Sequence, residues 1–355
     1  MITAIRAVLV LFAVLLGTAL SGCATAPFKP PAEDLRAATA GSVLRSLSID
    51  PAVEERILAL DPEHIGDDDV RNALAKGPTP RIFAVHGGVY GVYVLMESFA
   101  QFLIGMGYPE EKIRDPRDGT YSHSPYEGSA QQAGEIAWYY EHEGVRPMLI
   151  GHSQGGIEVV TVLHELAGTF GAERKVFNPL TRQFEDRTII VDPLTGHDRP
   201  VVGVSVAYAS VVGTGGWALA LPASWKVLPV IRSIPDSVDE FTGYRIGLDL
   251  FAWDAPGLEG AKLFRANGKA NVRNVTLPAE YSHIFVPVTA HLAQSGPMRA
   301  WINAFDPDHK GNLAPLPDGN ASNVMWAADL WHSIKKHWCL EAQRLLRARR
   351  TVAGL

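Results

Sequence analysis

Cysteine is scarce in this chain, which has two among its 355 residues. Two cysteines cannot build a disulfide-rich scaffold, and no CxxC motif or Cys/His cluster indicates a zinc site. The chain also lacks an excess of positive charge, because 32 Lys and Arg stand against 38 Asp and Glu, a net charge of −6. This balance excludes the electrostatic footprint of a nucleic-acid-binding protein, so we expect no nucleic-acid partner.

Charged residues make up 20% of the chain and hydrophobic residues 47%. Such a composition can bury a large core, and it excludes intrinsic disorder. A glycine-rich stretch at 213–216 is short and lacks the lysine of a phosphate-binding loop, which argues against a nucleotide cofactor. The sequence therefore predicts a folded protein that has neither a cofactor nor a metal in its active site.

The N-terminus carries an uncharged apolar run at residues 7–20. A membrane-spanning helix needs about 20 apolar residues, so this run has the length of a signal-peptide core. It ends in Leu-Ser-Gly-Cys at positions 20–23, which resembles the lipobox of bacterial lipoproteins. The resemblance implies that residues 1–22 are removed as a signal peptide and that Cys23 is lipidated. An uncleaved anchor, or a secretory signal with a chance cysteine, is the alternative.

The residues after the cysteine bear on where the protein is held. Ala24 follows Cys23, and in lipoproteins the absence of aspartate at that position implies delivery to the outer membrane. Residues 23–32 contain three prolines among mostly small residues, which is typical of a semi-rigid tether. We therefore expect the lipid to attach the protein to the membrane, with the folded part beginning at residue 33. The periplasmic or surface face stays open.

Strand-like and helix-like segments alternate along the folded part. A short apolar run at 81–85 predicts a buried strand, a glycine turn follows, and residues 92–104 read as a helix. The order recurs downstream, with a helix at 130–142 and a buried strand at 147–150. Such alternation predicts an α/β fold with a mostly parallel central sheet flanked by helices.

A serine lies between two glycines in Gly151-His152-Ser153-Gln154-Gly155. This is the G-x-S-x-G pattern of a nucleophile elbow, in which a strained turn between strand and helix requires glycine on both sides. With the His86-Gly87-Gly88 turn after the earlier strand, the pattern resembles the lipase and esterase branch of the α/β-hydrolase superfamily. The resemblance covers residues 81–305 and implies an α/β-hydrolase fold with Ser153 as the nucleophile.

The same resemblance implies an oxyanion hole. In α/β-hydrolases one backbone N–H comes from the residue after the nucleophile and another from the turn after an early strand. Those positions here are Gln154 and Gly88. A plain tight turn at His86-Gly87-Gly88 is the alternative.

The general base is sought among the histidines after Ser153, because the triad order in this family is serine, acid, histidine. His283 follows a strand-like segment at 272–277 and a short loop, where the last strand would deliver a catalytic histidine. His291 is the alternative, and a purely structural role for His283 stays open. The other histidines in this part lie on predicted helices or in polar loops: His164, His197, His309, His332 and His337.

The acid must lie between the serine and the histidine. Residues 241–247 can serve as the preceding strand, and Asp249 follows it closely. Asp254 lies five residues further on and stays open, because a small shift of the strand boundary would favour it. Either carboxylate would orient the imidazole and stabilise its cationic form.

Three additions decorate the predicted hydrolase domain of residues 33–305. Two similar turn signals around a strand-like segment predict a β-ribbon at 174–200. The apolar segment at 213–238 either forms a lid or cap over the site or packs into the core. Residues 306–355 are expected to form a loop and an extra C-terminal helix whose apolar side packs on the same domain.

These features predict a serine hydrolase that cleaves carboxylic esters through a Ser-His-Asp triad and an acyl-enzyme. An apolar cap suits a small-molecule or lipid ester with a hydrophobic acyl chain. An acyltransferase or an amidase would use the same triad, and a non-catalytic binding scaffold would keep only the fold. The acyl preference and the oligomeric state stay open.

Overall fold

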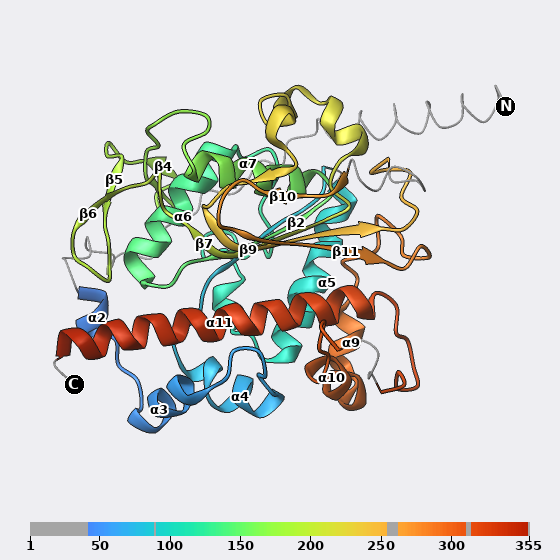
Figure 1. Cartoon of the computed structure of the whole chain (residues 1–355), viewed down its shortest axis with the longest axis horizontal. Coiled ribbons are helices and arrows are strands. Elements are labelled where there is room, and N and C mark those ends of the chain that lie inside the picture. The colour runs from blue at the N-terminus through green and yellow to red at the C-terminus, as the bar shows by residue number, and fades with distance from the viewer. Residues whose placement is uncertain (1–41, 89, 254–261, 310–313, 354–355) are drawn as a thin grey trace.

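The centre of the fold is a five-stranded sheet in which every neighbouring pair of strands is parallel (Figure 1). The computed structural model describes residues 42–353 except 89, 254–261 and 310–313. The strand order is β1-β2-β7-β9-β11, with bounds β1 (Ile82–Val85), β2 (Met148–His152), β7 (Val206–Val212), β9 (Val238–Ile246) and β11 (Asn271–Leu277). The predicted α/β fold with a mostly parallel sheet is confirmed. The predicted signal peptide, the predicted tether and Cys23 lie outside the described residues.

Helices cover both faces of this sheet. One face packs against α5 (Tyr90–Met106), α9 (Ala290–Gln294), α10 (Gly296–Asn303) and α11 (Val324–Ala353), with α2 (Ser42–Ser46), α3 (Pro51–Ala59) and α4 (Asp67–Asn72) nearby. The other face packs against α6 (Ser129–Glu143) and α7 (Gln154–Leu166). Successive residues of a strand point to opposite faces. Accordingly Ile82 and Ala84 of β1 join the first core, and Phe83 and Val85 join the second.

The long C-terminal helix α11 runs beside the sheet and is the red element of Figure 1. Its apolar side is buried, as predicted, and includes Val324, Trp331, Ile334, Trp338 and Leu345. Its basic side chains pair within the fold: Arg344 with Glu341, and Arg349 and Arg350 with Glu54. The extra C-terminal helix is therefore an integral part of the core.

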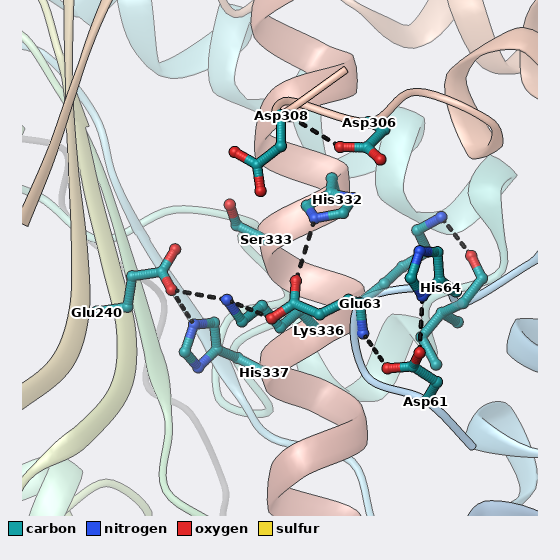
Figure 2. Close-up of polar contacts among 12 residues, drawn as sticks. Asp61, Glu63, His64, Glu240, Asp306, Asp308, His332, Ser333, Lys336 and His337 are labelled. Carbon is teal, nitrogen blue, oxygen red and sulfur yellow. Dashed lines mark hydrogen bonds and ion pairs between the residues drawn. The ribbon is translucent and has the colours of Figure 1, made fainter. Parts of the chain in front are cut away.

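A polar cluster also ties α11 to the sheet, as Figure 2 shows. The Lys336 Nζ lies 3.1 Å from Oε2 of Glu240 on β9 and 2.8 Å from Oε1 of Glu63. The His337 Nε2 lies 3.4 Å from the same Glu240 oxygen. Since all three elements meet at Lys336, this cluster joins the N-terminal segment, α11 and the sheet.

The insertion at 174–200 forms two small ribbons where a single ribbon was expected. The strands are β3 (Phe177–Asn178), β4 (Gln183–Phe184), β5 (Ile189–Val191) and β6 (Asp198–Pro200), paired antiparallel as β3–β4 and β5–β6. The side chains of Asn178 and Asp192 each accept hydrogen bonds from two backbone N–H groups further on. Each turn signal therefore closes a hairpin of its own.

The apolar segment at 213–238 is partly exposed and partly packed into the core, and its predicted role as a lid stays a prediction. Its short 3-10 helices span Gly216–Ala220, Pro222–Ser224 and Leu228–Val230, and β8 (Ser233–Ile234) pairs with β10 (Arg265–Ala266). Trp217 and Trp225 are 57% and 59% exposed, whereas Val227 and Ile234 belong to the core. Across the part of the chain that the structure describes, no helix is both long enough and apolar enough to cross a membrane.

Candidate active site

Ser153 sits on a strained turn between β2 and α7. Its backbone has φ 54° and ψ −117°, in a region that residues with a side chain rarely adopt. The Ser153 N–H donates to the Val212 carbonyl of β7 at 2.9 Å, which anchors the turn to the neighbouring strand. Strain of this kind persists only where the surroundings enforce it. The turn places the serine hydroxyl beyond the carboxyl end of β2.

The second glycine of the motif is required by a close backbone approach. A Cβ atom on Gly155 would lie 2.1 Å from the Val85 carbonyl oxygen and 2.6 Å from that of His86. Both of these atoms belong to the backbone at the end of β1, so they cannot swing aside. The G-x-S-x-G spacing thus lets α7 start against the turn after β1.

Three side chains from three loops form a continuous hydrogen-bonded chain. The Nε2 of His283 lies 2.9 Å from the Ser153 Oγ, and its Nδ1 lies 2.6 Å from the Asp249 Oδ2. Asp249 follows β9 and His283 follows β11, so both lie beyond the carboxyl ends of parallel strands, where such sheets hold their sites. With the Nδ1 proton directed at Asp249, Nε2 is free to accept the serine proton.

Asp249 is held in place by the backbone that follows it. Its Oδ1 accepts hydrogen bonds from the N–H groups of Phe251 and Ala252, each at 3.0 Å. Its side chain is fully buried, so the carboxylate depends on these donors and on His283 in place of water. Oδ1 therefore holds the loop, and Oδ2 orients the imidazole.

The two alternatives from the sequence lie elsewhere. His291 is on α9, where burial lowers its pKa and its neighbour is the backbone of Ser322. The structure brings His283 to the serine and does not bring His291 there. Asp254 lies outside the described residues.

His152 is a residue of the site that sequence reasoning missed. Its Nε2 donates to the backbone carbonyl of His283 at 2.7 Å, and its ring is almost fully buried. Burial, followed by the charge of His283, lowers the pKa of His152 to about 3, so the ring is neutral. The only sequence signal was its position beside Ser153, because its partner lies 131 residues further along the chain.

Gly88 lies against the side chain of Gln154, because a Cβ atom on Gly88 would clash with the Gln154 Oε1. Gln154 is the first residue of α7, where backbone N–H groups lack partners within the helix. The Tyr126 hydroxyl donates to the Gly88 carbonyl at 3.0 Å and lies 3.2 Å from the Gln154 Oε1. Tyr126 therefore links the turn after β1 to the start of α7.

Exposed apolar side chains lie in the loops that carry Asp249 and His283. They lie in the loops after β9 and β11 and comprise Leu248, Leu250, Phe251, Trp253, Ile284 and Phe285. The Phe251 ring stacks on His283 with the ring centroids 5.4 Å apart, and Trp217 meets Trp253 edge to face at 5.3 Å. The segment at 213–238 thus shares an apolar rim with the loop that carries Asp249.

No family model and no curated protein matches the chain. Solved structures that match include a protein of unknown function from Agrobacterium tumefaciens, with 13% identity and a TM-score of 0.34 over 68% of this chain and 90% of the other. An α/β serine hydrolase homologue from Coxiella burnetii has 11% identity and a TM-score of 0.33, over 61% and 82% of the two chains. An esterase from Pyrobaculum calidifontis has 9% identity and a TM-score of 0.33, over 75% and 100%. At such values the function has to be inferred from the side chains of this chain itself.

Proposed function

We propose that the protein is a serine hydrolase that cleaves carboxylic esters through an acyl-enzyme. The observation that carries this proposal is the chain of contacts from Ser153 through His283 to Asp249, at 2.9 and 2.6 Å, with the serine on a strained turn. A serine hydroxyl is a weak nucleophile at neutral pH and requires a positioned base. Nucleophilic catalysis explains directly why a serine on a strained turn, a base and an orienting acid meet at one point.

Acylation begins with attack of the Ser153 Oγ on the ester carbonyl carbon while its proton passes to the His283 Nε2. The negative charge that develops on the carbonyl oxygen is stabilised by the backbone N–H groups of Gly88 and Gln154. Each such donor contributes about 3 kcal/mol to the transition state. Collapse of the tetrahedral intermediate breaks the ester C–O bond, and Nε2 returns the proton to the departing alcohol.

Deacylation repeats these steps with water. His283 accepts a proton from the water molecule as it attacks the acyl-enzyme, and then returns it to the Ser153 oxygen as the carboxylic acid leaves. The Asp249 side chain stabilises the imidazolium in both halves of the reaction.

The substrate class that we propose is an ester with a hydrophobic acyl group, either a small molecule or a lipid. Its support is the apolar rim around His283, where Phe251 and Phe285 are each more than half exposed. Apolar walls with few polar groups are typical of pockets that bind hydrophobic ligands. Hydrolysis of p-nitrophenyl esters should therefore rise with acyl length up to an optimum. A preference confined to acetate would contradict this substrate class.

The test of the nucleophile is labelling with a fluorophosphonate probe. The wild-type chain should label at one site, and Ser153→Ala should abolish both labelling and ester hydrolysis while the circular dichroism spectrum is unchanged. If the folded wild-type protein does not label, the enzymatic proposal is wrong.

The test of the acid compares two substitutions. Asp249→Asn should lower kcat by about 10⁴-fold, because the asparagine favours the wrong tautomer of the histidine. Asp254→Asn serves as the matched control and should retain most of the activity. The reverse pattern would assign the acid to Asp254.

We further propose that a lipid on Cys23 holds the enzyme at the outer membrane of a bacterial cell. The support is the Leu-Ser-Gly-Cys sequence at 20–23, with alanine following it. Metabolic labelling with a palmitate analogue should occur in the wild type and be lost in Cys23→Ser. Labelling that persists in the variant would refute the anchor.

A further inference from the structure

A second group of ionisable side chains lies apart from the triad. One potential ligand atom from each of Asp115, His123 and Glu135 lies within 4.8 Å of the others. The three residues line a cavity of about 10 Å³, which has room for a single water-sized particle. Asp115 and His123 come from the connection between α5 and α6, and Glu135 lies on α6.

Glu135 is the unexplained member of this group. It is 1% exposed, and its Oε2 has no hydrogen-bond partner among the residues that the structure describes. A buried carboxylate without a partner is costly, so this oxygen calls for a ligand.

The other two side chains are held as metal ligands usually are. The His123 Nδ1 lies 3.3 Å from the Glu127 Oε2, which leaves Nε2 for a ligand, and Phe83 stacks on the ring with centroids 5.0 Å apart. Arg117 donates to both oxygens of Asp115: its backbone N–H and Nε donate to Oδ1 at 2.8 Å, and its Nε at 3.0 Å and its Nη2 donate to Oδ2. A carboxylate behind the imidazole and a donor behind the carboxylate are typical of the outer shell of a metal site.

The charges of the group call for a divalent cation. Arg81 and Arg114 also line the cavity, but they pair with Glu143 and Glu110. The carboxylates of Asp115, Glu127 and Glu135 then have the single guanidinium of Arg117 against them, which leaves two negative charges when His123 is neutral. The surroundings therefore favour added positive charge at this point.

We propose that Asp115, His123 and Glu135 bind a divalent cation, for which Zn²⁺ is the best match. One imidazole and two carboxylates form a donor set that suits Zn²⁺, with water as the fourth ligand. Atoms within 4.8 Å of one another all lie within about 2.8 Å of a common point, so shifts of under about 1 Å give Zn²⁺ bond lengths. No Cys-rich or His-rich sequence motif indicates this site, because its ligands come from separate segments of the chain.

The cation would brace the oxyanion turn. The His123 N–H donates to the Ala84 carbonyl at 2.7 Å, and the His86 N–H donates to the His123 carbonyl at 3.2 Å. Three residues after His123, the Tyr126 hydroxyl reaches the Gly88 carbonyl. Binding would therefore stiffen the loop that holds Gly88, although cation binding itself does not depend on the proposed hydrolysis.

The experiment titrates Zn²⁺ into the untagged, chelator-treated full chain by calorimetry and follows the Tm. We expect one Zn²⁺ per chain and, at 100 times Kd, a rise in Tm of about 5 °C. Glu135→Gln should weaken binding by at least about tenfold. Glu158→Gln is the matched control and should bind as the wild type does. Glu158 on α7 also has a buried carboxylate oxygen without a hydrogen-bond partner in the described structure and a pKa raised by burial to about 7, but it lies outside the cluster.

Two results would overturn the proposal. One is the absence of both calorimetric binding and a Tm shift in the wild type, which would make the group an ion-pair network with a protonated His123. The other is binding to Glu135→Gln as tight as to the wild type. If Glu135→Gln does not fold, the wild-type titration decides alone. Because labelling of Ser153 needs no cation, failure here would leave the proposed hydrolase standing.

Discussion

Gly213 offers a direct way to disturb the triad without altering any of its members. It follows β7 with φ +63°, and a Cβ atom there would lie 2.9 Å from both Cε1 and Nδ1 of His283. Carbon atoms in contact prefer about 3.5–4.0 Å, so Gly213→Ala must push the imidazole away by about 0.5–1 Å. The same ring carries the 2.6 Å contact to Asp249 and the 2.9 Å contact to Ser153.

A displacement of this size should lower kcat/KM for ester hydrolysis by about 10²-fold, or about 2.7 kcal/mol in transition-state free energy. The alanine must also adopt a left-handed backbone, which should lower the free energy of unfolding by about 1 kcal/mol. Steady-state hydrolysis of one p-nitrophenyl ester measures the first effect, and urea unfolding measures the second.

The matched control is Gly203→Ala. Gly203 also has a positive φ, +102°, but no heavy atom lies within 4 Å of the Cβ that an alanine would place there. This variant should lose stability through the backbone alone and keep a kcat/KM near that of the wild type. A wild-type kcat/KM in Gly213→Ala, or an equal loss in Gly203→Ala, would refute the reasoning.

Two further predictions concern acid stability. Burial opposes ionisation of Glu240, but hydrogen bonds and charges from His337 and Lys336 lower its pKa from 4.5 to about 2. Its stabilisation is therefore complete above pH 4.5 and is lost as the pH falls toward 2. Glu240→Gln should cost about 3 kcal/mol of unfolding free energy at pH 7, and an equal cost at pH 2.5 in urea titrations would contradict this. Burial lowers the pKa of His152 from 6.5 to about 3, so between these pH values the unfolded chain binds a proton that the folded protein does not. The fold should therefore lose stability progressively as the pH drops from 6.5 toward 3. His152→Gln keeps a donor but cannot titrate, so its midpoint of urea unfolding should depend less steeply on pH over that range than that of the wild type.

Local patterns in the sequence were enough to predict the strands at 81–85 and 147–150 and the turn between strand and helix at Ser153. The reason is that a buried strand and a tight turn depend on neighbouring residues, which a short window contains. The Ser153 backbone angles and the close approach of Gly155 to β1 agree with that local pattern. By contrast, the sequence patterns predicted a single ribbon at 174–200, whereas the structure has two. Each ribbon is closed by a side chain that accepts hydrogen bonds from its own turn.

Contacts between distant segments could not be predicted from the sequence. Two examples are the choice between His283 and His291 and the pairing of His152 with the His283 carbonyl. Both depend on the sheet order, which places the carboxyl ends of β2 and β11 at the same end of the sheet. The group of Asp115, His123 and Glu135 is likewise assembled from a loop and a helix that carry no shared motif.

The sequence by itself determined the alternation of strands and helices and the serine on its elbow, because hydrophobic periodicity and glycine spacing act over a few residues. Only the tertiary structure decided which histidine faces Ser153, which side chains surround the site and where buried charges meet. Those relations depend on the order of strands in the sheet and on distances of a few ångströms. Packing of the whole chain sets these distances.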